Sequence, residues 1–128
     1  MVGLVIVSHS WKIAEGVVDL AQQMAGDYKG LRAAGGLEDG EIGTDAVRIM
    51  EAVRDADEGD GVVILADLGS GVMSAETAVE FLDGEVNVRI ADAPIVEGAV
   101  AAAVEACAGS SMEEVIQSAE EAREMRKQ

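Results

Sequence analysis

Two short apolar runs constrain the fold of this chain more than any other feature of its sequence. Residues 2–7 read VGLVIV, and residues 61–67 read GVVILAD, with Asp67 as the first charged residue. Apolar runs of this length without polar alternation are typical of strands that are buried on both faces. Both runs therefore predict central strands of a sheet that is covered by helices on its two sides.

The stretches that follow these runs predict helices. Residues 11–25 carry apolar side chains at helical spacing, and Gly26 is expected to end this helix. Thr44 is expected to cap a second helix, and Ser110 with Glu113 is a candidate capping box for the last one. The apolar residues expected to form the buried stripes of the first three helices are Ile13, Val17, Leu20, Ala21, Met24, Val47, Ile49, Met50, Val53, Met73, Val79, Phe81 and Leu82.

Two weaker strands complete the pattern, at residues 29–34 and 85–90. Strands and helices then alternate along the chain, which indicates parallel strands joined by right-handed crossovers. We predict an α/β fold: a small doubly wound, mainly parallel four-stranded sheet of order 2-1-3-4 with helices on both faces. A length of 128 residues predicts a single domain that spans residues 1–128.

The composition limits the classes of partner. Twenty-five acidic and nine basic residues give a formal net charge of −16, which disfavours nucleic acid and anionic membranes as partners. The acidity suits either a surface adapted to a high-salt medium, where screening is short-ranged, or the attraction of a basic partner. The acidic residues are spread along the whole chain, which favours the first explanation. Because no apolar stretch matches a signal peptide or a membrane span, and Cys107 is the only cysteine, we expect a cytoplasmic protein without disulfides.

The only histidine, His9, follows the first predicted strand directly, between Ser8 and Ser10. Ligands of doubly wound sheets bind at the carboxyl ends of the strands, where neighbouring connections diverge. If the first and third strands are neighbours, His9 and Asp67 face each other across one crevice. A carboxylate beside one ring nitrogen fixes the imidazole tautomer and leaves the other nitrogen with its lone pair. This pairing suits a nucleophilic histidine.

Residues near helix starts indicate what such a nucleophile attacks. Ser10 opens the first helix, and Gly69, Ser70 and Gly71 lie at the start of the third. Helix N-termini attract anions, and glycine permits the close backbone approach that a phosphoryl oxygen requires. We therefore expect these four residues to face a phosphoryl group or a partner, in a phosphohistidine carrier that uses no metal and no organic cofactor. Each motif taken alone has a simpler explanation. His9 can be a structural histidine, Asp67 can cap the next helix, and DLGSG can be a plain tight turn.

Other classes of protein fit the motifs less well. A receiver-like domain phosphorylated on Asp67 needs an acidic pair after the first strand, where this chain has SHS. A serine hydrolase lacks its G-x-S-x-G elbow, a P-loop lacks its GK[ST], and a metal site lacks a second ligand paired with the histidine. A structural or partner-binding module without catalysis remains open.

The motifs together resemble a known family. LVIVSHS and AEGV at the start, GGLEDGEIGT in the middle, DLGS after the third strand and APIVEGA before the fourth helix span residues 2–106. They resemble the phosphotransfer subunits of dihydroxyacetone kinase, the DhaM family, and more distantly the mannose-type IIA (EIIA) domains of the sugar phosphotransferase system. The form of the fourth motif favours the kinase family. The resemblance implies a mannose-type EIIA fold over the whole domain.

The resemblance also implies roles and partners. His9 matches the phosphorylated histidine of the family, and Asp67 matches the acid that orients and polarises it. The phosphoryl group would come from phosphoenolpyruvate through enzyme I and HPr, and pass to ADP in the nucleotide-binding kinase subunit. The family implies a homodimer. Some relatives carry HPr-like and enzyme I-like domains after this one, and here we expect other polypeptides to supply those steps. A sugar-transport EIIA component is the alternative function.

Several further residues have two explanations each. Trp11 is expected either to cover the start of the first helix or to contact a partner. Arg48 is expected on a solvated helix surface, with contact to a phosphoryl group of a neighbouring subunit as the alternative. Cys107 is interpreted as a small core residue, and Glu76 and Glu97 are expected to face solvent.

Overall fold

The computed structural model describes the whole chain, residues 1–128. Its sheet is fully parallel with the strand order β2-β1-β3-β4, which confirms the predicted fold class and topology. The strands are β1 (Gly3–Ser8), β2 (Leu31–Gly35), β3 (Val62–Ala66) and β4 (Val88–Ile90). The helices are α1 (Trp11–Ala25), α2 (Ala46–Ala56), α3 (Gly69–Leu82), α4 (Ile95–Cys107) and α5 (Met112–Glu121), followed by the 3₁₀ turn η1 (Ala122–Glu124).

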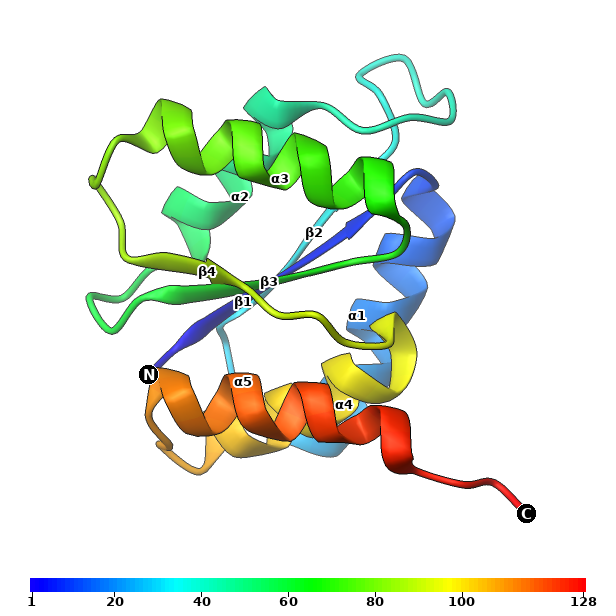
Figure 1. Cartoon of the computed structure of the whole chain (residues 1–128), viewed down its shortest axis with the longest axis vertical. Helices are drawn as coiled ribbons and strands as arrows, with labels where there is room; N and C mark the ends of the chain where they lie inside the picture. Colours follow the sequence, from blue (N-terminus) through cyan, green and yellow to red (C-terminus); the bar gives the residue numbers. More distant parts are fainter.

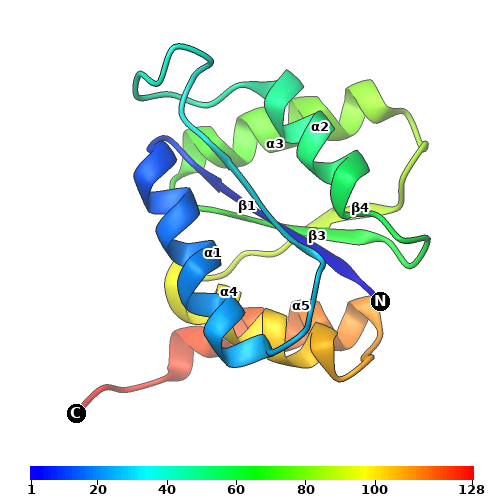
Figure 2. The same cartoon turned by 180° about the vertical axis from the view of Figure 1, so that it is seen from behind.

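The helices form two layers around the sheet. Helices α2 and α3 cover one face, and α1, α4 and α5 cover the other (Figures 1 and 2). The central strand β1 is buried along its whole length, and successive residues alternate between two cores. Leu4 and Ile6 belong to the core under α1, α4 and α5, whereas Val5 and Val7 belong to the core under α2 and α3. This period of two explains why the run is apolar without interruption.

The edge strands are shorter or shifted relative to the prediction. β4 covers Val88–Ile90 instead of residues 85–90, because only three of its residues pair with β3. β2 covers Leu31–Gly35 instead of residues 29–34. No helix of the chain combines the length and the apolar character that a membrane crossing requires.

The prediction missed two helix caps by one residue each. Asp45, not Thr44, caps α2 through a bond from Val47 N–H, and the capping box of α5 is Ser111 with Glu114, not Ser110 with Glu113. Each predicted residue has instead a partner elsewhere: Thr44 bonds to Ser74, and Ser110 bonds to Glu105. Asp is a better N-cap than Thr, and the Thr44 hydroxyl has a partner thirty residues away, whereas Ser110 is taken up by a contact with the preceding helix. Gly26 ends α1 with φ of +57°, as predicted.

The buried faces of α1 and α3 consist mainly of small residues, which corrects part of the predicted core. α1 buries Ala14, Val17, Ala21 and Ala25, and α3 buries Gly71, Ala75, Ala78 and Leu82. The helices lie so close to the sheet that a Cβ on Gly35 would meet Ala14 Cβ at 2.7 Å. Such close packing leaves no room for large side chains. The predicted core residues that are exposed instead are Ile13, Leu20, Met24, Val47, Met73 and Phe81.

Candidate functional site

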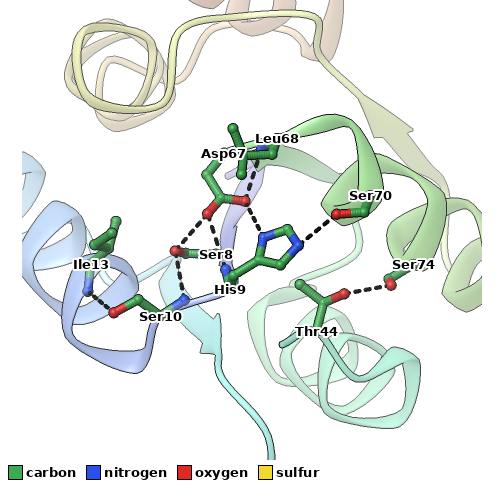
Figure 3. A network of polar contacts seen from close by, with 9 residues as sticks. All are labelled: Ser8, His9, Ser10, Ile13, Thr44, Asp67, Leu68, Ser70 and Ser74. Carbon is green, nitrogen blue, oxygen red and sulfur yellow. Dashed lines mark hydrogen bonds and ion pairs between the residues drawn. The ribbon is translucent and has the colours of Figure 1, made fainter. Parts of the chain in front are cut away.

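The site lies where two neighbouring strands send their helices to opposite faces of the sheet. β1 continues into α1 on one face, and β3 continues into α3 on the other, so the chain diverges at their carboxyl ends (Figures 1 and 3). His9 follows β1 and Asp67 follows β3. The register pairs Val7 with Ala66, which brings these two candidate residues next to each other from positions 58 residues apart.

The Asp67 carboxylate accepts four hydrogen bonds. Oδ1 accepts from His9 Nδ1 at 3.0 Å and from the Leu68 N–H at 2.8 Å. Oδ2 accepts from the Ser8 hydroxyl at 2.9 Å and from the His9 N–H at 3.0 Å. Both oxygens are thus held in place, and the predicted contact between His9 and Asp67 is present (Figure 3).

These bonds determine the ionisation of Asp67. Burial alone would raise the pKa of this carboxyl, but the hydrogen bonds from the His9 backbone, the His9 ring and the Ser8 hydroxyl together hold its pKa below the ordinary value. Asp67 is therefore a carboxylate at neutral pH, and a carboxylate can only accept hydrogen bonds.

The ionised state of Asp67 decides the chemistry of His9. Nδ1 must carry a proton in order to donate to Asp67, so Nε2 of the neutral ring holds the free lone pair. Ser70 Oγ lies 2.6 Å from Nε2 and donates to that lone pair. The His9 side chain retains 22% of its exposure, so its outer nitrogen is within reach of a reactant from solvent. The geometry is that of an oriented nitrogen nucleophile.

The start of α3 lies beside this nucleophile. Its N-cap residue Leu68 provides no side-chain cap, and the N–H groups of Gly69 and Ser70 find no acceptor in the chain. A Cβ on Gly71 would lie 3.2 Å from Asp67 Oδ1 and 3.7 Å from His9 Cε1. The helix therefore presents free donors and its positive dipole end next to Nε2, as a bound anion requires.

Ser10 differs from the other three predicted phosphate-facing residues. Its hydroxyl accepts from the Ile13 N–H at 3.3 Å and so caps α1, and its backbone N–H donates to Ser8 Oγ at 3.0 Å. The hydroxyl proton stays free for another acceptor. That Ser10, Gly69, Ser70 and Gly71 contact a phosphoryl group remains a prediction.

Three hydroxyl residues that lie in or beside the site were not predicted from the sequence to belong to it. Ser8 is the only buried polar residue of the chain, and its hydroxyl joins Asp67 to Ser10. Thr44 and Ser74 share a hydrogen bond of 2.6 Å that ties the loop before α2 to α3 (Figure 3). The adjacent Gly43 N–H donates to His9 O at 2.9 Å. A serine that ends an apolar strand was a usable signal for Ser8, whereas no local pattern indicated that Thr44 and Ser74 would lie together beside the site.

The remaining candidates lie outside the hydrogen-bond network of His9 and Asp67. Trp11 is 47% exposed at the start of α1. Arg48 is half-buried on α2: Nη2 reaches Gly35 O at 3.4 Å, and Nε has no partner, so the predicted solvated position is wrong. Glu76 faces solvent as expected, whereas Glu97 is half-buried and pairs with Lys127 at 2.9 Å.

Cys107 and the possible metal ligands complete the list of candidates. Cys107 is partly buried beside the core, where its thiol donates to Ala25 O. No three His, Cys, Asp or Glu side chains are grouped so that they could hold a metal ion.

Comparisons with known proteins identify the family of the chain. A family model described as EIIA-man, PTS system fructose IIA component, matches residues 3–117. The phosphoryl donor subunit DhaM of the PEP-dependent dihydroxyacetone kinase of Escherichia coli K12 is 44% identical. The alignment covers 100% of this chain and only 28% of that protein. The corresponding DhaM subunit of kinase 2 of Listeria innocua is 40% identical, with 91% of this chain and 95% of that subunit covered. The crystal structure of EF1359, a protein of unknown function, has a TM-score of 0.82 at 34% identity, with 92% of each chain covered.

The matched model and the fold define the class, a mannose-type EIIA domain, as the motifs predicted. The chain belongs to the EIIA-man family and, within it, to the DhaM phosphoryl donor subunits of dihydroxyacetone kinase. It spans little more than a quarter of the length of the Escherichia coli relative and nearly the whole length of the Listeria one.

Proposed function

We propose that this chain is a phosphohistidine carrier of the dihydroxyacetone kinase relay. His9 accepts a phosphoryl group from HPr, which is charged from phosphoenolpyruvate through enzyme I. It passes the group to ADP in the nucleotide-binding subunit of the kinase. The observation that carries the proposal is the 3.0 Å contact between His9 Nδ1 and Asp67 Oδ1, which leaves Nε2 as the nucleophile beside the start of α3.

In the accepting step the lone pair of Nε2 attacks the phosphorus of the donor's phosphohistidine. The Nε2–P bond forms, the donor's N–P bond breaks, and its electron pair stays on the donor's ring nitrogen. The His9 ring then carries positive charge, because Nδ1 keeps its proton while Nε2 gains a substituent. The Asp67 carboxylate stabilises that charge at 3.0 Å, so this chain needs no proton transfer.

The start of α3 binds the oxygens of the phosphoryl group that is transferred. The phosphoryl group takes the place on Nε2 that the Ser70 hydroxyl occupies in the free protein, so the hydroxyl turns to donate to a phosphoryl oxygen. The free N–H groups of Gly69 and Ser70 donate hydrogen bonds to the phosphoryl oxygens and so stabilise the negative charge on them in the transition state. In the onward step an oxygen of ADP attacks the phosphorus, and the electron pair of the Nε2–P bond returns to Nε2.

The relatives favour dihydroxyacetone kinase over sugar transport as the destination. Subunits named DhaM match this chain over nearly their whole length in Listeria innocua and Lactococcus lactis. A mannose-type sugar transporter component would use the same histidine chemistry but a different acceptor. An experiment that identifies the acceptor therefore distinguishes the kinase function from sugar transport.

The test is intact-mass analysis of the chain after incubation with phosphoenolpyruvate, enzyme I and HPr. We expect the mass to rise by one phosphoryl group, in an acid-labile and base-stable form. His9→Gln should gain nothing while unfolding at the same temperature as the wild-type chain. A phosphorylated His9→Gln, or an unphosphorylated wild type, would refute the assignment.

Onward transfer is measured by adding the kinase subunit with ADP and dihydroxyacetone to the purified phosphorylated chain. We expect loss of the phosphoryl group and formation of dihydroxyacetone phosphate. A phosphorylated chain that discharges to a sugar transporter component and not to the kinase subunit would favour the alternative.

The proposal includes the organisation of the chain. We propose that residues 1–128 act as one phosphocarrier domain and that two copies associate, as the family resemblance implies. Sedimentation equilibrium of the purified chain tests the dimer directly, since a monomer at all concentrations would contradict it.

A further inference from the structure

A second crevice opens at the same edge of the sheet as the histidine. β3 sends α3 to one face and β4 sends α4 to the other, so the chain diverges between these strands as it does between β1 and β3 (Figures 1 and 2). Such points of divergence are where doubly wound sheets bind their ligands. The crevice has a volume of about 310 Å³ and is lined by Ala66, Val72, Glu76, Ile90, Ala91, Asp92 and Ala93.

Apolar side chains form the walls of this crevice, and the phosphoryl chemistry uses none of them. Val72 and Ile90 are only partly buried, so they keep apolar surface in contact with solvent. Leu68, the N-cap residue of α3, is 63% exposed. Apolar surface thus faces solvent both at the residue after Asp67 and in the crevice.

The mouth of the crevice carries negative charge. Glu76 is exposed and has no ion-pair partner in the chain. The Asp92 side chain is 94% exposed, with Arg123 at 3.6 Å as its cation. The whole chain has a net charge of −16, so its long-range field also attracts cations. An apolar group that enters here is therefore best flanked by Lys or Arg.

A partner that reacts with His9 must cover this crevice. Ala66, which lines the crevice, is the chain neighbour of Asp67, which touches the His9 ring. A typical protein interface buries about 800 Å² on each partner, which corresponds to a disc of about 16 Å radius. A Cβ on Gly71 would lie 3.4 Å from Ala66 Cβ and 3.7 Å from His9 Cε1, so this wall of the crevice lies well inside such a disc centred on Nε2.

We propose that this crevice anchors an apolar side chain, flanked by Lys or Arg, of a protein that exchanges the phosphoryl group with His9. The inference rests on the proposed function, because it concerns the partners of that relay. A polyol substrate does not fit the crevice, since its alanine, valine and isoleucine walls offer few hydrogen-bond partners for hydroxyl groups. Within the interface the crevice acts as the apolar centre, and Glu76 acts as the charge that selects and steers the partner.

The test compares Glu76→Lys and Ala93→Leu with the wild-type chain. The first reverses the charge at the mouth, and the second fills the crevice from its wall. Asp19→Lys is the matched control, because Asp19 is exposed on α1 and has no ion-pair or side-chain hydrogen-bond partner. Rates of phosphoryl transfer are measured by rapid quench with phosphorylated HPr as donor and, separately, with the kinase subunit and ADP as acceptor. Thermal unfolding establishes that each variant is folded.

We expect Glu76→Lys to lower the second-order rate constant about tenfold with at least one partner at low salt, with a smaller loss at high salt. Ala93→Leu should lower it about fivefold or more at both salt concentrations, while the rate at saturating partner stays the same. Asp19→Lys should transfer like the wild type in each arm.

Three outcomes are decisive. A wild-type chain that accepts no phosphoryl group refutes the proposed function itself. A wild type that accepts it, together with Glu76→Lys and Ala93→Leu variants whose rates equal those of Asp19→Lys with both partners, overturns the docking crevice and leaves the carrier function standing. If Ala93→Leu unfolds, Glu76→Lys and its salt dependence decide alone.

Discussion

At the amino edge of the sheet, where the strands begin, the polar groups form bonds with other groups of the same chain. The buried Tyr28 hydroxyl donates to Val2 O, the N-terminal ammonium pairs with Asp60 at 2.6 Å, and the Gly3 N–H donates to Gly61 O at 2.9 Å. A Cβ on Gly3 would lie 2.4 Å from Ala56 O, so the backbones approach as closely as they can.

The carboxyl edge uses similar groups differently. Asp67 is fully engaged, but His9 Nε2 meets only the hydroxyl of Ser70, and the Gly69 N–H at the start of α3 has no acceptor. The polar groups of the amino edge therefore stabilise the fold, whereas some of those at the carboxyl edge have no partner within the chain. Substitutions at the two edges should separate accordingly: those at the amino edge lower the free energy of unfolding, and those at the carboxyl edge slow transfer.

Asp67→Asn should give the largest effect at the carboxyl edge. Asparagine has one acceptor oxygen, so its amide NH₂ must face either the His9 N–H and Ser8 or the Leu68 N–H and Nδ1. In the second orientation Nδ1 becomes an acceptor, and the proton moves to Nε2 and removes the nucleophile. We expect transfer to His9 to slow about 10²-fold or more, measured by rapid quench.

The matched control for this variant is Asp45→Asn. Asp45 caps α2, where asparagine is an equally good cap, so transfer and stability should stay unchanged. Equal transfer rates for Asp67→Asn and Asp45→Asn would show that the carboxylate has no role in the chemistry.

The stability of the same variant should depend on pH. The pKa of Asp67 is lower in the folded chain than its ordinary value of 3.8, so its ionised form stabilises the fold above that pH. The stabilisation disappears as the pH falls through the lower, folded-state pKa. Urea unfolding at a series of pH values should therefore show the wild type more stable than Asp67→Asn at neutral pH, with the difference vanishing in acid. A difference that is constant with pH would contradict this assignment.

Gly3→Ala should give the largest effect at the amino edge. Its Cβ would meet the Ala56 carbonyl oxygen, and β1 and α2 must shift to accept it. We expect a loss of about 2 kcal/mol in the free energy of unfolding in urea, with unchanged transfer by the folded protein. Gly16→Ala is the control: no atom lies within 4 Å of its Cβ inside α1, so it should stabilise the chain by about 0.5–1 kcal/mol. A slowed transfer in Gly3→Ala would show that the two edges are coupled.

Ser70→Ala should have a smaller effect at the carboxyl edge. It removes one hydroxyl donor beside Nε2 and leaves the N–H groups of α3 in place. We expect transfer to slow about tenfold, the equivalent of about 1.4 kcal/mol, with rescue by Ser70→Thr. Failure of threonine to restore the rate would assign the effect to helix packing instead of the hydroxyl.

Tyr28→Phe should have the smallest effect of the set. The ring stays in the core, but the hydrogen bond to Val2 O is lost and that carbonyl remains buried. We expect a loss of about 1 kcal/mol in the free energy of unfolding and no change in transfer. A loss of transfer without a loss of stability would reverse the assignment of the two edges.

Most of the fold and the centre of the site could be predicted from local patterns. The apolar runs before His9 and Asp67 identified two buried strands, and parallel topology then placed both residues at one edge of the sheet. The face that each helix buries could not be predicted in the same way. Ile13, Leu20 and Met24 follow helical spacing but are exposed, because close contact between α1 and the sheet admits only small side chains.

The partners of the hydroxyl groups also depended on tertiary structure. Thr44 was expected to cap α2, yet its hydroxyl meets Ser74 thirty residues away. The crevice beside β4 likewise combines residues from β3, α3 and the segment after β4. The sequence by itself determined which segments are strands and that His9 and Asp67 follow two of them, because period and chain geometry are local. The packed structure decided which surfaces touch, because steric fit depends on residues that the sequence keeps far apart.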